Sequence, residues 1–212
     1  MPEPILPYYL IGITGGSASG KSLLIQTLRG LFSEQELCIV SQDDYYKTID
    51  QQQTDEHGIH NFDLPESIDS ELMYQDLLSL AKGKEVIKKE YIFERKDKDA
   101  GFKTFKPAPV VIIEGIFVFS FPAISSLIEL SVFVDCNADL RFERRFKRDI
   151  MERGISEEKV LHQWKYHVIP AHKNYVKPFR KTADIIINNY SSMDKGVALI
   201  SNHIHAILNS KT

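Results

Sequence analysis

Five short apolar runs divide the chain at wide intervals. They cover residues 9–13, 37–40, 110–113, 130–134 and 185–187, and they are rich in β-branched side chains with no alternating polar positions. Runs of this kind are typical of strands that are buried on both faces. We therefore predict five buried strands.

Helical patterns fill the intervals between these strands. They cover residues 22–32, 67–82, 138–152, 156–176 and 193–208. The second pattern opens with Ser67 and Glu71, one residue from an ideal capping box, and ends at Gly83. Pro170 predicts a break in the fourth. Strands that alternate with helices predict an α/β fold, with a parallel sheet flanked by helices on both faces.

One segment fits neither pattern. Residues 85–106 are charged and aromatic without a clear period. We interpret them as an irregular or hairpin excursion over the functional site. The length of 212 residues suits one domain with a large core, and we expect residues 1–212 to form it.

A complete phosphate-binding motif links the first strand to the first helix. It consists of Gly15, Gly16, Ser17, Ala18, Ser19, Gly20, Lys21 and Ser22. Glycines let successive backbone N–H groups face the phosphates, and the helix N-terminus adds positive potential. Lys21 is expected to bridge the β- and γ-phosphates of ATP, and the Ser22 hydroxyl to bind Mg²⁺. The alternative is a Gly/Ser-rich turn that binds no ligand, but such a turn would not need to lie between a strand and a helix.

Acidic residues follow two other predicted strands. Glu114 ends the run at 110–113, where a carboxylate beside the phosphate loop suits Mg²⁺. Asp43 and Asp44 follow the second strand and reach the same edge of the sheet. A kinase that acts on an alcohol needs a carboxylate near the hydroxyl proton. Either aspartate can serve, although for Asp44 a solvated turn is the preferred interpretation.

The helix at 138–152 carries an arginine-rich face. Arg141, Arg144, Arg145 and Arg148 fall within roughly 100° of arc at helical spacing. Such a stripe is commonly a solvated face, but guanidinium groups also stabilise charge on a phosphoryl group in transfer. Arg153 and Gly154 then mark a point where a lid could hinge.

The composition and net charge of the chain limit the kinds of binding partner that we expect. Hydrophobic residues make up 43%, charged residues 26%, and the net charge is -3, so neither nucleic acid nor an anionic membrane is expected as a partner. The first residues lack the pattern of a signal peptide, and Cys38 and Cys136 fit reduced core positions, which together favour the cytoplasm. Among the seven histidines, His162 and His167 are five apart, a poor spacing for shared metal ligation.

An ordered set of motifs resembles the uridine kinase family. The motifs lie at residues 11–22, 41–43, 61–65, 114–116, 132–135, 144–154 and 183–186. The resemblance implies a five-stranded parallel sheet with a lid at about 145–156 and a β-hairpin. It implies ATP as phosphoryl donor and uridine or cytidine as acceptor.

The same resemblance assigns roles to individual residues. It makes Asp43 the catalytic carboxylate near the 5′-hydroxyl, with Lys21 and Arg148 also in the catalytic set. It makes Asp63 the ribose ligand. The acceptor pocket would be lined by Tyr46, Tyr91 and Gln163. The lid over the phosphates would contribute Arg145, Arg148 and Arg153, with Arg145 reaching the acceptor and Arg153 the nucleotide.

Three positions depart from the family pattern. Ile92 stands where many members have an aspartate between two aromatic residues. Lys96 stands where the family has a base-contacting histidine, so it becomes the candidate substrate residue there. Ile155 replaces a ribose-contacting arginine. All three departures lie on the acceptor side.

Several functions therefore remain open from sequence alone. One is a nucleoside kinase, and a second is a related kinase with another hydroxylated acceptor, favoured by Lys96 and Ile155. A third is an acceptor-free ATPase or nucleotide switch, although the Asn-Lys-x-Asp signature of switch GTPases is absent. Intact Lys21 and Asp43 argue against a fourth, a binding protein without activity. Assembly into a homo-oligomer is also left open.

Overall fold

The computed structural model describes residues 8–91, 101–190 and 192–210. Five parallel strands form the central sheet in the order β2-β5-β1-β6-β7. The strands are β1 (Tyr9–Thr14), β2 (Leu37–Ser41), β5 (Val110–Glu114), β6 (Leu130–Asp135) and β7 (Ile185–Asn188). The predicted α/β architecture and all five predicted strands are confirmed, with bounds within one residue of those expected at each end.

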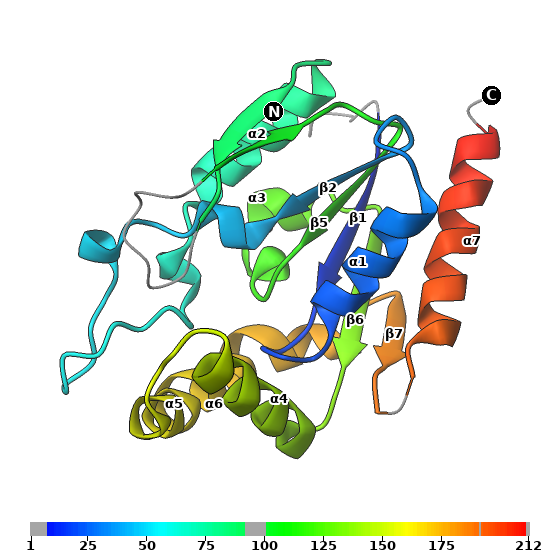
Figure 1. The fold of residues 1–212 in the computed structure, drawn as a ribbon. Coiled ribbons are helices and arrows are strands. Elements are labelled where there is room, and N and C mark those ends of the chain that lie inside the picture. Colours follow the sequence, from blue (N-terminus) through cyan, green and yellow to red (C-terminus); the bar gives the residue numbers. More distant parts are fainter. Residues whose placement is uncertain (1–7, 92–100, 191, 211–212) are drawn as a thin grey trace.

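The strands alternate their side chains between two buried cores, because successive strand residues point to opposite faces. In β1, Leu10 contributes to one core, whereas Ile11 and Ile13 contribute to the other. Helices α2 (Ser70–Ala81) and α3 (Pro122–Ser125) cover the first face. Helices α1 (Lys21–Leu31) and α7 (Asp194–Ser210) cover the second, as Figure 1 shows. Helices α4 (Ala138–Met151), α5 (Glu157–Gln163) and α6 (Ile169–Ala171) lie beyond the carboxyl ends of the central strands.

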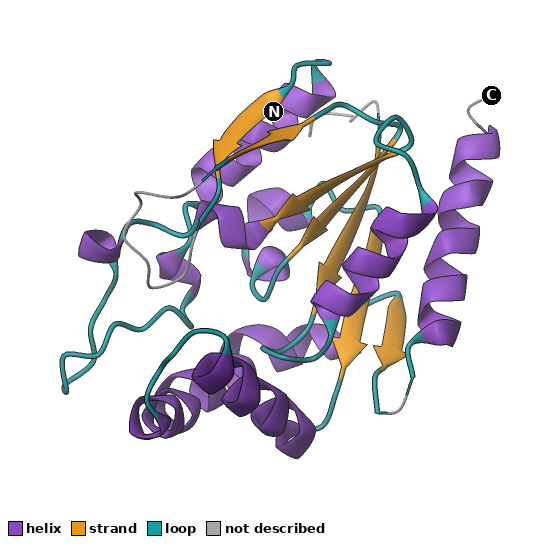
Figure 2. Cartoon of the chain, in the orientation of Figure 1, coloured by secondary structure: helices purple, strands orange, loops and turns teal. Residues whose placement is uncertain are grey.

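A separate antiparallel hairpin lies beside the sheet (Figure 2). It pairs β3 (Val86–Lys89) with β4 (Phe102–Phe105), and Val86 faces Phe105 across the pair. Both of these side chains are buried in the core that also holds α2. The hairpin interpretation of residues 85–106 is thus confirmed for its two strands, while residues 92–100 lie outside the described part of the chain.

Two local expectations are wrong. The cap of α2 is Asp69, whose side chain accepts from the Leu72 amide, rather than the box formed by Ser67 and Glu71. Pro170 does not break the fourth helical segment either. That segment continues from α5 to Val176, and α6, which contains Pro170, lies between two π turns at Trp164–Val168 and His172–Val176.

No helix within the described residues is long and apolar enough to span a bilayer.

Candidate active site

The phosphate loop joins β1 to the first turn of α1. Gly20 adopts the left-handed conformation at φ 104°, and Ala18 does so at φ 60°, which curls the backbone into the loop. The Ser19 amide donates to the Gly16 carbonyl at 3.0 Å and closes the turn. The buried Asn189 side chain, after β7, donates to the Ser19 carbonyl at 2.8 Å. The first amides of α1 have no intrahelical partner, so this loop presents donors suited to phosphate oxygens.

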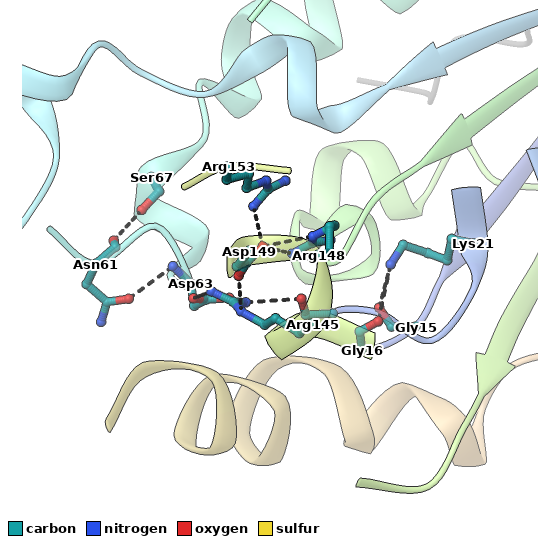
Figure 3. A network of polar contacts seen from close by, with 11 residues as sticks. Gly15, Gly16, Lys21, Asn61, Asp63, Ser67, Arg145, Arg148, Asp149 and Arg153 are labelled. Carbon is teal, nitrogen blue, oxygen red and sulfur yellow. Dashed lines mark hydrogen bonds and ion pairs between the residues drawn. The ribbon is translucent and has the colours of Figure 1, made fainter. Parts of the chain in front are cut away.

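Lys21 lies buried against the same loop. Its ammonium donates to the Gly15 carbonyl at 2.9 Å and more weakly to the Gly16 carbonyl at 3.4 Å, as Figure 3 shows. Burial lowers the pKa of Lys21, while nearby Glu114 and Asp43 oppose that change. Ser22 follows with an exposed side chain in the first helical turn.

Strand register brings the acidic residues to this edge. Glu114 lies opposite Ile13 in β1 and opposite Ser41 in β2. The Ser41 hydroxyl donates to Glu114 Oε1 at 2.6 Å and orients the carboxylate. Desolvation and the charge of Asp43 raise the pKa of Glu114, whereas Lys21 and Ser41 lower it. Carboxylate and hydroxyl oxygens are the ligands that Mg²⁺ prefers, so Glu114 and Ser22 could hold this ion.

Asp43 lies on a 3-10 turn at Gln42–Tyr45 that directly follows β2. Its backbone N–H donates to the Ser41 hydroxyl, and the side chain is exposed within the cleft. The surrounding cleft walls still desolvate the carboxylate and raise its pKa, against the opposing charges of Lys21 and Arg153. The neighbouring Gln42 anchors the turn, because its buried side-chain carbonyl accepts from the Phe117 amide at 2.8 Å.

Asp44 departs from the expected solvated turn. The residue is buried, and its carboxylate accepts from the Lys103 ammonium of β4 at 2.9 Å. Lys103 also pairs with Glu90 at 3.0 Å. Asp44 therefore ties the strand-end turn to the hairpin and does not face the cleft where Asp43 lies. The pairing required a long-range contact that local sequence could not show.

One small cavity collects residues from the phosphate loop, the strand ends and the arginine helix. Its walls are formed by Ser17, Asp43, Tyr46, Phe62, Asp63, Ile116, Arg145, Arg148 and Arg153. Six of the predicted site residues thus meet at one place with a phosphate-loop serine. A larger groove of about 340 Å³ lies between β2 and β4, but no phosphate-loop residue lines it.

The Asp63–Arg145 pair forms one wall of this cavity. The two side chains make a bidentate contact at 3.1 and 3.2 Å, and both residues are buried. Arg145 also donates to the Ser17 hydroxyl of the phosphate loop at 3.0 Å. A planar guanidinium suits this two-pronged arrangement, which links the predicted ribose ligand to the phosphate loop.

Asp149 is a functional candidate that the sequence interpretation did not assign. This fully buried carboxylate pairs with Arg145 at 3.1 Å, with Arg148 at 2.8 Å and with Arg153 at 3.2 Å (Figure 3). Two of these partners are four residues away along the chain, which is a spacing that could have indicated the contact. One acidic side chain therefore positions all three arginines of the predicted lid.

The arginine face of α4 is not simply solvated. Arg141 and Arg145 are buried, whereas Arg148 is half-buried. A side chain at Gly16 would clash with the Arg141 guanidinium, so the helix packs closely on the phosphate loop. Arg144 points elsewhere, toward the Cys136 sulfur at 3.6 Å. The predicted lid comprises the last turns of α4 and the turn at Gly154, where φ is 67°.

The other residues predicted to contact the acceptor do not all line this cavity. Tyr46 and Tyr91 lie together, with ring centroids 5.1 Å apart. Gln163 is buried in α5 but is not among the residues that line the cavity. Ile155 is buried too, and its amide donates to the Asp149 carbonyl. Ile92 and Lys96 lie outside the described residues.

Comparison with known proteins agrees with this geometry. The model of the phosphoribulokinase / uridine kinase family matches residues 10–195. The chain is 36% identical over 194 residues to the uridine kinase of Alkaliphilus metalliredigens, covering 90% of this chain and 93% of that protein. It is 37% identical over 210 residues to uridine-cytidine kinase 2-B of Danio rerio, covering 95% and 80%. Some relatives are longer: the chain spans 44% of uridine kinase-like protein 5 of Arabidopsis thaliana, at 32% identity over 207 residues and 98% of this chain.

Solved structures agree in fold. A "possible uridine kinase" from Bacillus stearothermophilus superposes with a TM-score of 0.53 at 19% identity, covering 84% of this chain and 88% of that one. D-glycerate 3-kinase from Cryptococcus neoformans gives 0.56 at 15% identity, with 86% of each chain covered. The sequence matches extend over the phosphate loop, the acidic strand ends and the arginine helix described above. This chain therefore belongs to the phosphoribulokinase / uridine kinase family.

Proposed function

We propose that this protein transfers the γ-phosphoryl group of ATP to the 5′-hydroxyl of a pyrimidine ribonucleoside, uridine or cytidine. The observation that carries the proposal is the shared cavity. It places Ser17 of the phosphate loop, the carboxylates Asp43 and Asp63, and three arginines around one space. A phosphoryl donor held by the phosphate loop and a small hydroxylated acceptor could meet at this place.

The phosphate loop would hold the nucleotide. Its amides and Lys21 face the place where a triphosphate would lie, and Lys21 would follow negative charge as it moves from the γ-phosphoryl to the leaving oxygen. Ser22 and Glu114 would hold Mg²⁺, which fits their oxygen donors. When bound, the ion would neutralise phosphate charge.

Asp43 would orient the acceptor hydroxyl and accept its proton. Its raised pKa makes it a better base than an ordinary carboxylate. Arg148 and Arg153 each leave part of the side chain exposed, at 32% and 28%, so both can reach a transferring phosphoryl group. Asp149 holds both guanidinium groups in place.

The acceptor side favours a sugar hydroxyl pair. Asp63 presents a carboxylate at the cavity wall, already oriented by Arg145, and carboxylates accept well from vicinal hydroxyls. The aromatic side chains of Tyr46 and Phe62 lie beside it, with ring centroids 5.9 Å apart, and could contact a base. The relatives' names favour a nucleoside over another hydroxylated small molecule.

The test is an acceptor panel with ATP and Mg²⁺, read as ADP formed and as phosphorylated product by mass spectrometry. Uridine and cytidine should each drive turnover, whereas 5′-deoxyuridine, the matched control without the acceptor hydroxyl, should not. Turnover with ribulose 5-phosphate but not with uridine would favour the other acceptor class. ADP formation that no acceptor stimulates would contradict the kinase proposal.

A further inference from the structure

A second cluster of polar side chains lies apart from the cavity described above. Nε2 of His162 lies 2.5 Å from Oδ2 of Asp55, and Nε2 of His167 lies 2.8 Å from the same oxygen. The three candidate ligand atoms all lie within 4.8 Å of one another. None of these residues lines the cavity that holds Asp43 and Asp63.

A π turn brings the two histidines closer together than their spacing predicts. In an α-helix, residues five apart point roughly 140° away from each other at about 100° per residue. Between His162 and His167 the backbone forms the π turn Trp164–Val168, and the Ile169 amide donates to the Trp164 carbonyl five residues back. This wider turn brings the two imidazoles to the same side, and such turns are frequent at functional sites.

The carboxylate of Asp55 is held in a defined orientation. Its Oδ1 accepts from the backbone amides of His57 and Ile59, each at 2.9 Å. Oδ2 is therefore directed to the two imidazoles. His167 is 2% exposed, and its other ring nitrogen has no hydrogen-bond partner among the described residues. The hydrogen bond that holds this buried ring is thus the one between its Nε2 and Asp55.

We propose that Asp55, His162 and His167 bind a transition-metal dication of the zinc class. Two imidazole nitrogens and one carboxylate oxygen are the donor set of many three-ligand zinc sites, which keep a fourth position for water. A tetrahedral ion with bonds of about 2.0–2.1 Å holds its ligands roughly 3.4 Å apart. In the present structure the two distances from Nε2 to Asp55 Oδ2, 2.5 and 2.8 Å, are shorter than that value, and all three ligand atoms lie within 4.8 Å of one another. Mg²⁺ and Ca²⁺ are excluded as preferred ions because they favour all-oxygen sites.

An entry path exists on one side of the cluster. The side chains of Asp55 and His162 are 16% and 14% exposed, so the fourth position can face solvent. The exposed ring of His57 lies nearby, with its centroid 4.9 Å from that of His162. Without an ion, both imidazoles must carry a proton on Nε2 to donate to Asp55. An ion instead needs the lone pair of each Nε2, so each of these ring protons must move to Nδ1 or leave when the ion binds.

The location gives the ion a mechanical consequence. Asp55 belongs to the loop that leads to Asp63, while His162 precedes the buried Gln163 in α5. An ion would cross-link these two segments on the acceptor side of the cleft. Any effect on acceptor KM rests on the proposed function, whereas metal binding itself does not.

The test is a calorimetric measurement of zinc binding to chelator-treated, nucleotide-free protein. One equivalent should bind, and His162→Ala should weaken binding by at least about 100-fold, the upper end of the loss seen for a mere outer-shell partner. His167 is buried, so its removal can impair folding; Asp55→Asn, which keeps the shape of a half-buried side chain, is the second variant. Far-UV circular dichroism checks that each variant is folded. His203→Ala, on α7, is the matched control and should bind like wild type.

Cobalt(II) provides an independent readout, because a four-coordinate ion absorbs visible light much more strongly than the hydrated ion. These bands should appear in wild type and be lost in folded Asp55→Asn. The proposal is overturned if wild type shows no saturable zinc binding, or if both variants bind like wild type. It is also overturned if Glu114→Gln abolishes zinc binding while His162→Ala does not. All three results leave the acceptor panel, and hence the kinase proposal, unaffected.

Discussion

The phosphate side and the acceptor side of the cleft are built on different principles. The phosphate side uses backbone groups between β1 and α1 and acids fixed by parallel strand register. The acceptor side uses side chains from loops, the hairpin and α4, joined by long-range pairs such as Asp63 with Arg145. A backbone site tolerates little variation in geometry, whereas a side-chain site can be retuned by single substitutions. Ile92, Lys96 and Ile155, where this chain departs from the family pattern, are positions that the resemblance assigns to the acceptor side.

The largest expected effect is on the chemical step between the two sides. Asp43→Asn should lower kcat by about 10³-fold, since an amide keeps the shape but cannot accept the proton. ATP binding, measured by calorimetry, should change little. Asp44→Asn is the neighbouring control: its loss should lower stability through Lys103 and leave most of kcat. A dead Asp44→Asn beside a normal Asp43→Asn would show that the wrong carboxylate has been chosen.

A slightly smaller loss is expected on the phosphate side. Lys21→Ala should lower kcat by about 10²-fold or more, because the charge beside the leaving oxygen is removed. Steady-state kinetics provide the measurement. Arg29→Ala removes an exposed cation from the same helix and should be close to wild type. Activity of Lys21→Ala within a few-fold of wild type would refute the assignment of the phosphate loop.

A substitution at Asp149 tests how the phosphate side and the acceptor side of the cleft are linked. Asp149→Asn leaves three arginines without their shared counter-ion, and removing one partner of a buried pair costs about 3–5 kcal/mol of unfolding free energy. Misplaced arginines should also lower kcat/KM by roughly 10²-fold. Denaturant titration and kinetics measure the two effects. Asp139→Asn, exposed on the first turn of α4, is the control. Equal behaviour of the two variants would remove Asp149 from the site.

The pH dependence of kcat/KM should report the desolvation of Asp43 by the cleft walls. Its raised pKa predicts an acid limb in kcat/KM above the ordinary aspartate value of about 3.9. Activity then falls as pH drops through the raised pKa, since the protonated carboxyl cannot act as base, by about tenfold per pH unit. A pH–rate profile with uridine measures it, and an acid limb at the ordinary value or lower would contradict the prediction.

The smallest effect is expected in the retuned acceptor pocket. Lys96 offers only donors, whereas a neutral histidine also offers an acceptor, so Lys96→His should raise kcat/KM for uridine by up to about tenfold. Lys98→His in the same segment is the matched control. A variant worse than wild type would mean that the departures are compensated elsewhere. Ile155→Arg is a poorer test than Lys96→His, because it would place a charge at a buried position.

The contrast also explains what could be predicted from sequence. Strand ends and the phosphate loop were predictable because a parallel sheet brings the carboxyl ends of its strands to one edge. Asp44 and Lys103 are 59 residues apart, and no local pattern indicates their pairing. The π turn that unites His162 with His167 was also unpredictable, since helical spacing assumes 3.6 residues per turn.

Asn189 gives the phosphate loop an unexpected dependence on the order of synthesis. Its side chain holds the Ser19 carbonyl across 170 positions of the chain, beside the edge strand β7. A nascent chain that has completed β1 and α1 still lacks this support until synthesis has passed β7 and Asn189. Nucleotide should therefore bind best to nascent chains in which β7 and Asn189 have already been made, and less well to shorter ones.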